Sequence, residues 1–417
     1  MKFIRNESEK LNIQINIFIS NKIINLFRFI FVVLLILINK KFGNLSIKEH
    51  PFYLSIRKPI IEKDENKKKV LISGRKYLNK CLKGNNLKKY KTNKKSKVSA
   101  IIPVFNSMKT IKAALFSIQN QNLTKIEIIL INDFSTDNTS EIIKEIQQND
   151  QRIILIENHK NMGTLYSRSI GALLAKGRYI FCLDNDDMFF DNDIFDFFYK
   201  IGIRENLDLI GFQTIYVWNY YDNISSMRDL YTYQYPNEYF VSQPELGRWM
   251  VTFNGKFLVH NNMIWDKCIK TSIYQKAVNL MGEKRYSNYL VWAEDTCINF
   301  IIFNIAKSFK YYHKYGILHF KSKKTASFIQ PMEHKLYGET FFLEIIFEYS
   351  KNDNDKNLAV EQILFMEKQF NLTKNYNNKN AFKIKSIINK IMNCKYITKL
   401  NKRKINKKFK GYLTNMI

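Results

Sequence analysis

The chain has 417 residues, enough for roughly two to three typical domains and a large buried core. Apolar residues make up 46% of the sequence and aromatic residues 14%, which excludes a fully disordered polycation. The net charge of +29 makes nucleic-acid binding the first function to test, while five scattered cysteines without paired spacing exclude a disulfide scaffold and a zinc finger or ribbon.

The excess positive charge lies at the two ends of the chain. Residues 1–97 hold 24 basic and 6 acidic side chains and residues 321–417 hold 20 and 8, whereas residues 98–320 hold 22 and 23. Both ends are rich in Lys and Asn, so compositional bias and a basic surface that faces an anionic membrane are both open explanations. The basic runs lack interleaved aromatic residues and nucleic-acid-binding motifs. We therefore expect no nucleic-acid partner.

The first apolar segment, residues 23–38, is the membrane candidate. Its uninterrupted part, Phe29 to Ile38, is short of the ~20 residues of a spanning helix, but two apolar residues and Arg28 before it lengthen the segment. No small-residue cleavage site follows, which favours an uncleaved signal-anchor over a cleaved signal peptide. A buried core helix is the other alternative, but nothing near the segment has the pattern of a partner domain. We expect a single-pass membrane protein of the endomembrane system (ER or Golgi), with an anchor region at 1–40 and a basic stem at 41–96.

From Lys97 onward, short apolar strands alternate with helical stripes. Strands are predicted at 98–104, 126–131, 153–156, 179–183 and 309–318. Helices are predicted at 108–121, 135–149 (capped by Ser135 and Thr136), 164–175 and 297–306, with further helical spacing at 333–350 and 357–370. This alternation predicts a mainly parallel, helix-covered sheet that binds ligands at the carboxyl ends of its strands.

An acidic sequence follows the predicted strand 179–183. Asp184, Asp186 and Asp187 place three carboxylates within four residues, which is costly unless a cation neutralises them. An isolated acidic turn is more often a helix cap or a solvated loop, but polar residues also follow the strands that end near 104 and 131. Mg²⁺ or Mn²⁺ suits such oxygen ligands. Because the chain has neither G-x-G-x-x-G nor a P-loop, a bound nucleotide has to be held by carboxylates and metal.

Four motifs stand in an order that resembles the family 2 glycosyltransferases. They are SAIIPVFN (99–106), IEIILINDFSTDNT (126–139), ENHKNMG…YIFCLDNDD (157–187) and WAED (292–295). The resemblance covers about residues 97–320 and implies an α/β GT-A fold, with a mixed, mainly parallel sheet flanked by helices. The membrane segment would precede this catalytic domain, and a helical, basic extension at 321–417 would follow it.

The resemblance also implies a donor site for a nucleotide-diphospho-sugar. Asp133 would accept the edge of the base, and Arg168 would approach the diphosphate. The predicted nucleotide-binding residues are Pro103, Phe105, Asn106, Asp133, Arg168 and Asp184. The predicted ligands of Mn²⁺ or Mg²⁺ are Asp186, Asp184, Asp187 and His319, the last because a late His binds metal in many enzymes of this fold, although a lone His is more often structural.

Three residues depart from the family pattern. Asn132 stands where a first Asp is usual, Phe134 where Gly is usual, and Ser169 where Asn commonly follows the Arg. These departures motivate an alternative function, in which a catalytically inactive GT-A domain binds sugar or serves as a scaffolding subunit.

The catalytic base is expected at Glu294 and Asp295. On residues alone, an acidic first turn of a helix is the simpler explanation. The resemblance instead implies that Asp295 takes the proton of the acceptor hydroxyl, that Glu294 orients Asp295 or the acceptor, and that a single displacement inverts the anomeric centre. Metal would steady the leaving diphosphate. The sequence therefore predicts a metal-dependent inverting glycosyltransferase of the hexosyl or N-acetylhexosaminyl class, which acts on a hydroxyl-bearing glycan, lipid or protein.

Aromatic residues supply weaker acceptor candidates, because their faces suit sugar rings. Trp265, Lys267 and Trp292 are predicted acceptor contacts, with the Tyr216–Tyr221 segment as a further one. Core packing is the competing interpretation for each of them.

Overall fold

The computed structural model describes residues 95–218, 263–321 and 332–350, together with four short strands between 218 and 263 and Lys356. The predicted anchor at 23–38 and the predicted helix at 357–370 lie outside the described residues, as does almost all of the stem. None of the helices within the described ranges is both long and apolar enough to cross a membrane.

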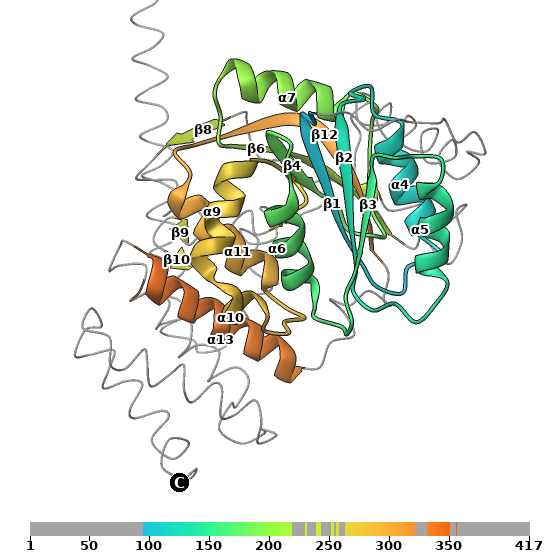
Figure 1. Cartoon of the computed structure of the whole chain (residues 1–417). Coiled ribbons are helices and arrows are strands. Elements are labelled where there is room, and N and C mark those ends of the chain that lie inside the picture. The colour runs from blue at the N-terminus through green and yellow to red at the C-terminus, as the bar shows by residue number, and fades with distance from the viewer. Residues whose placement is uncertain are drawn as a thin grey trace, which may run out of the picture. The chain divides into compact units, whose positions relative to one another are not determined.

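The sheet begins with four parallel strands. They are β1 (Val98–Val104), β2 (Ile126–Asn132), β3 (Ile153–Glu157) and β4 (Tyr179–Cys182), arranged in the order β3-β2-β1-β4 (Figure 1). The residues of β1 and β2 are buried throughout, because helices cover both faces of the sheet. This explains why both strands are nearly continuous apolar runs in the sequence.

Antiparallel pairing extends the sheet beyond β4. The order continues β11 (Lys267–Lys270), β6 (Leu209–Trp218), β12 (Ser308–Lys321) and β5 (Met188–Phe189). Only the β6–β12 pair in this half is parallel. Short strands at the edges complete the pairing, namely β7 (Leu230–Tyr231) on β6, β8 (Tyr239–Ser242) on β12, and a separate pair of β9 (Thr252–Phe253) and β10 (Lys256–Phe257). The predicted mixed sheet with flanking helices is confirmed, but the prediction that it is mainly parallel is wrong, because four strand pairs of the described sheet are parallel and five are antiparallel.

Helices cover the two faces of the sheet (Figure 1). One face carries α4 (Ile111–Gln119), α5 (Thr139–Gln147) and α7 (Ile194–Arg204). The opposite face carries α6 (Thr164–Leu174), α9 (Thr271–Met281), α10 (Glu283–Tyr286), α11 (Glu294–Ile305) and α13 (Met332–Tyr349). Neighbouring residues of β1 contribute to different cores, since Ile102 faces the α4 side and Ile101 faces the α6 side.

The strand order reverses between β1 and β4. The chain runs outward from β1 through β2 to β3 and then returns to the other side of β1. In open α/β sheets, such a reversal opens a crevice at the carboxyl ends of the strands, where ligands bind. Helix α6 packs closely over β1 here, because a Cβ on Gly171 would lie only 2.5 Å from Cγ2 of Ile101. This close approach places Arg168, one turn earlier on α6, near the crevice.

The predicted cap of α5 is wrong. The helix begins at Thr139, and Ser135 and Thr136 belong to the preceding loop. Ser135 Oγ accepts a hydrogen bond from Asn106 N (3.0 Å), and Thr136 N donates to Asn106 Oδ1 (2.8 Å). These residues therefore join the loop after β2 to the loop after β1, a contact between segments about 30 residues apart.

Candidate active site

Asp133, at the carboxyl end of β2, organises the neighbouring loop. Its Oδ1 accepts hydrogen bonds from Asn158 Nδ2 (2.8 Å) and Met162 N (2.7 Å), and its Oδ2 accepts one from Gly163 N (2.7 Å). Asp133 is buried, and Gly163 has a φ of 88°, a conformation that favours glycine. In this structure the carboxylate holds the Asn-x-Gly turn in place. Its role at a nucleobase stays a prediction.

Two exposed phenylalanines flank this strand end. Phe105 follows β1 and is 43% exposed, while Phe134 follows β2 and is 50% exposed. Phe134 has a φ of 65° and Asn106 a φ of 47°, so both occupy the left-handed region. The glycine that is usual at this position in the family would adopt that conformation without strain, whereas Phe134 adopts it against the preference of its side chain. Asn132 accepts a hydrogen bond from Ser135 N through Oδ1 (3.1 Å) and so helps to hold the same loop.

The acidic residues after β4 gather as predicted from their spacing. Ligand atoms of Asp184, Asp186 and Asp187 all lie within 4.8 Å of one another. Burial, together with the charges of Asp187 and Asp184, raises the pKa of Asp186 to about 8. A carboxyl in this position loses its proton most readily when a cation is close by.

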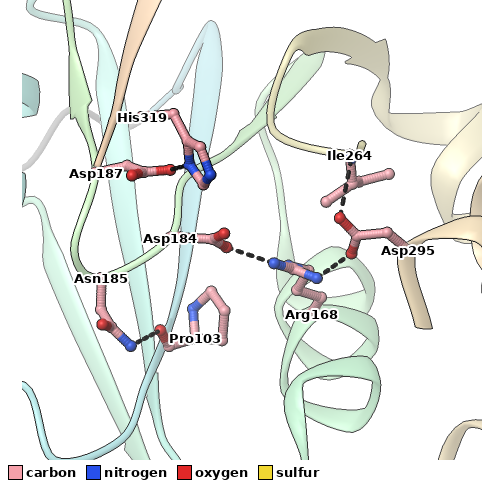
Figure 2. A network of polar contacts seen from close by, with 8 residues as sticks. All are labelled: Pro103, Arg168, Asp184, Asn185, Asp187, Ile264, Asp295 and His319. Atoms are coloured by element: carbon pink, nitrogen blue, oxygen red, sulfur yellow. Dashed lines mark hydrogen bonds and ion pairs between the residues drawn. The ribbon is translucent and has the colours of Figure 1, made fainter. Parts of the chain in front are cut away.

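Asp187 is fully buried, and both of its carboxylate oxygens contact other residues of the protein. Strand β5 pairs with β12 at Leu318, which brings the residue before β5 beside His319. Asp187 accepts a hydrogen bond from Phe320 N (3.0 Å), and its other oxygen lies 2.7 Å from His319 Nδ1 (Figure 2). Burial opposes the charged form of the imidazole, but the Asp187 carboxylate outweighs it and raises the pKa of His319. The contact fixes the ring through Nδ1.

Aromatic rings hold His319 from its other sides. The ring of Trp265 stacks on it at a centroid distance of 4.7 Å and an angle of 14°, and Tyr216 meets both rings edge-on. Trp265 is only 2% exposed. The sequence predicted that Trp265 contacts an acceptor directly. The structure instead places its ring behind the imidazole of His319. Tyr216 is buried as well, and residues 219–221 lie outside the described residues.

Arg168 connects the two sides of the site (Figure 2). Its guanidinium forms one ion pair with Asp184, at the end of β4, and another with Asp295, at the start of α11. The side chain is 4% exposed. Although burial disfavours the charged guanidinium, the charges of Asp295 and Asp184 raise its pKa further. Arg168 was predicted to approach a diphosphate, and here it joins the predicted donor site to the predicted base.

Glu294 and Asp295 are the first two residues of α11 and follow a residue with a strained backbone. Ala293 caps the helix with a φ of 62°, which is uncommon for a residue other than glycine. Asp295 also accepts a hydrogen bond from Ile264 N (3.2 Å), so both of its oxygens have partners. Burial, then the charge of Asp295, raises the pKa of Glu294 to about 7. Burial also raises the pKa of Asp295, against the opposing effect of Arg168.

Lys267 and Trp292, the other predicted acceptor contacts, are held by the protein. Lys267 is fully buried, and its ammonium donates to Met263 O and to Asp266 Oδ1. Trp292 is half-buried and donates through Nε1 to Glu339 Oε1 (2.8 Å). Tertiary packing turns Lys267 inward, against its prediction, and ties Trp292 to α13, while an acceptor contact of Trp292 stays a prediction. No sequence pattern indicated Glu339 or Ile264, because their partners lie 47 and 31 residues away in the chain.

The fold and the arrangement of the site are consistent with the GT-A fold, and comparison with known proteins shows which proteins the chain resembles. Residues 99–253 match the sequence model of glycosyl transferase family 2. This part of the chain is therefore similar to the family 2 glycosyltransferases, as its motifs indicated. The matched region covers the donor side of the site, and the remaining strands and helices complete the fold around it.

Curated relatives and solved structures show the same similarity. Glycosyltransferase GlyG of Streptococcus pneumoniae is 29% identical over 136 residues, which are 33% of this chain and 43% of GlyG. The Escherichia coli UDP-Glc:alpha-D-GlcNAc-diphosphoundecaprenol beta-1,3-glucosyltransferase WfaP is 44% identical over 90 residues, 22% of this chain and 35% of WfaP. The chain thus spans less than half of the length of these curated relatives. Staphylococcus aureus TarS 1–349 in complex with UDP-GlcNAc shares the fold, with a TM-score of 0.55, 15% identity, and coverage of 76% of this chain and 90% of TarS 1–349.

Proposed function

We propose that the protein transfers a sugar from a UDP-sugar to a hydroxyl acceptor, with a divalent metal ion and with inversion at the anomeric carbon. The observation that carries this proposal is the Arg168 bridge, which brings the donor-side Asp184 and the predicted base Asp295 together at the sheet's switch point. The choice of a UDP-sugar is supported by the UDP-GlcNAc that TarS binds and by the donor in the name of WfaP.

The residues after β4 fit Mn²⁺ or Mg²⁺. Burial, together with two acidic neighbours, raises the pKa of Asp186, and this is the setting in which a bound cation is most favourable. Asp184 and His319 would complete the protein ligands, with Asp187 holding the imidazole of His319 from behind. When bound, the metal would neutralise charge on the leaving diphosphate.

The chain's own residues then account for the transfer. Asp295 takes the proton of the acceptor hydroxyl, whose oxygen forms the new bond to the anomeric carbon while the bond to UDP breaks. One displacement without a protein nucleophile inverts the configuration. Glu294, with a pKa of about 7, lies beside Asp295 and orients it or the acceptor. Arg168 stays cationic and close to the negative charge that develops on the donor.

The acceptor is proposed to be a lipid-linked glycan. This rests on the name of WfaP, which specifies a sugar on diphosphoundecaprenol. The predicted anchor at 23–38 would place the domain beside such a substrate, in the ER or Golgi if the predicted location holds. The inactive scaffold is the less favoured alternative, since Asn132 and Phe134, which motivated it, are both accommodated in an ordered loop.

UDP release is the direct test. We expect the wild-type protein to release UDP from UDP-GlcNAc or UDP-glucose with Mn²⁺, and to lose this activity with a chelator and on Asp186→Ala. The matched control is Asp191→Ala, at an acidic residue of the same region that is outside the cluster. If no UDP-sugar is turned over, and UDP binding measured by thermal shift is the same in wild type and Asp186→Ala, the proposed function is wrong.

A further inference from the structure

Helix α13 lies outside the region that matches the family, yet it packs on α11. Its apolar residues join the core on that side of the sheet, and the ring of Phe342 meets Phe300 of α11 edge-on at 5.9 Å. Phe341, Ile345 and Ile346 are buried in the same core. The helix is therefore an integral layer of the domain, placed directly behind the helix that carries Glu294 and Asp295.

The first half of α13 holds Trp292. Glu339 accepts the Nε1–H of the indole at 2.8 Å, and Lys335 Nζ lies 5.0 Å from the ring centroid. The backbones also meet, because a Cβ on Gly338 would lie 2.1 Å from the carbonyl oxygen of Trp292. Only glycine allows this approach. Three residues of α13 thus fix the edge, the face and the main chain of Trp292.

Trp292 is followed at once by the residues that open α11. Ala293 holds its left-handed φ of 62° and accepts the first hydrogen bond of the helix from Cys297 N (3.0 Å). A strained conformation of this kind persists only where the surroundings impose it. On the other side, Tyr289 and Leu290 pack against Gly163, the turn held by Asp133. The segment 289–293 is therefore clamped between the donor-side turn and α13.

We propose that α13 is a positioning helix for the transfer reaction, in which Gly338 and Glu339 fix Trp292 and thereby aim the acidic pair that begins α11. The inference rests on the proposed function, since it assigns Glu294 and Asp295 to the reacting groups. Glu339 acts through Trp292 and does not itself reach the reacting atoms.

Kinetics of UDP release from UDP-GlcNAc with Mn²⁺ test this role. We expect Glu339→Ala and Trp292→Phe to lower kcat about tenfold, because small displacements of reacting groups are costly. KM should stay within about twofold, since the donor side is unchanged. Glu339→Gln keeps an oxygen acceptor and should restore most of kcat. Glu348→Ala is the matched control, because Glu348 lies on the same helix but pairs with Arg285.

A pH profile separates positioning from simple loss of folded protein. Glu294 faces Asp295, Arg168 and Asp184, and its burial raises its pKa. Loosening the segment 289–293 would admit water to Glu294 and lower this pKa. The fall of kcat at acidic pH should therefore begin at a lower pH in Glu339→Ala than in wild type. A purely structural role would lower kcat in proportion to the unfolded fraction and leave the limb in place. That result, or an unchanged kcat, overturns the inference.

Hydrogen exchange gives a readout that does not depend on turnover. Amides 294–297 should exchange faster in Glu339→Ala than in wild type and Glu348→Ala. Unchanged exchange would overturn the positioning role even if the wild-type protein released no UDP. Absence of UDP release from every UDP-sugar tested, with faster exchange in Glu339→Ala, would instead overturn the proposed function alone.

Discussion

The two halves of the sheet build their parts of the site in different ways. In the parallel half, each strand from β1 to β4 ends in a loop whose own residues contribute, and these loops all lie between residues 104 and 187. In the antiparallel half, the contributions come from single positions at Trp265, Asp295 and His319, far apart in the sequence. The loops after β1 to β4 are thus built by local motifs, whereas the predicted base Asp295 and the predicted metal ligand His319 are positioned by tertiary packing. Arg168 is the side chain that joins them.

The sharpest test of this division is Asp295→Asn. We expect UDP release to fall about 10³-fold, because a positioned general base contributes on that order. UDP binding with Mn²⁺, measured by thermal shift, should be retained, since the donor side is local to β1–β4. Glu294→Gln, the neighbouring change, should cost less. Equal loss of binding and turnover in Asp295→Asn would mean that the halves are not separable.

Lys267→Ala should mainly affect stability. The ammonium is fully buried with Asp266, and burial lowers the pKa of Lys267 and raises that of Asp266. Removing one partner leaves a buried group uncompensated, which costs about 3–5 kcal/mol of unfolding free energy. Lys200→Ala, which breaks an exposed pair with Asp196, should cost less than about 0.5 kcal/mol. Urea denaturation measures both, and a loss below that of Lys200→Ala would contradict this assignment.

The pH dependence of UDP release should report the base side. Glu294 has a pKa raised to about 7, so its charged form is lost as the pH falls through that value. Turnover should therefore decline as the pH falls below 7, towards the activity of Glu294→Gln. Because the pKa of Glu294 is raised in the folded protein, folding favours its protonated form. The contribution of Glu294 to the free energy of unfolding is therefore greatest below pH 4.5 and declines as the pH rises through about 7. Glu294→Gln should shift the acidic limb, whereas Glu283→Gln at a neighbouring helix should leave it in place.

The smallest expected effect is on the donor side, at Phe134. Its left-handed backbone disfavours any side chain by about 1–2 kcal/mol, while a glycine gives the unfolded chain extra entropy that favours unfolding by about 0.5–1 kcal/mol. Phe134→Gly should therefore raise the free energy of unfolding by about 0.5 kcal/mol. Phe134→Ala keeps the strain and should show no such gain. Equal stability of the two variants, measured by denaturant titration, would argue against backbone strain at this position.

How much of the fold could be predicted depended on whether its causes lie close together in the sequence. The strands β1 and β2 could be predicted because burial on both faces makes them continuous apolar runs. The cap of α5 could not, because Ser135 and Thr136 bond to Asn106 across about 30 residues. Side-chain orientation was the harder problem. Composition alone could not show that Lys267 turns inward or that the Trp265 ring lies behind His319.

The packing of α13 also determines where the chain can be cut. A protein shortened after residue 321 would expose the side of α11 that contains Phe300 and would lose the glycine contact that covers Trp292. Apolar surface of that kind promotes aggregation. A soluble fragment for crystallisation or for assays therefore has to extend at least through Tyr349, well past the last strand of the sheet.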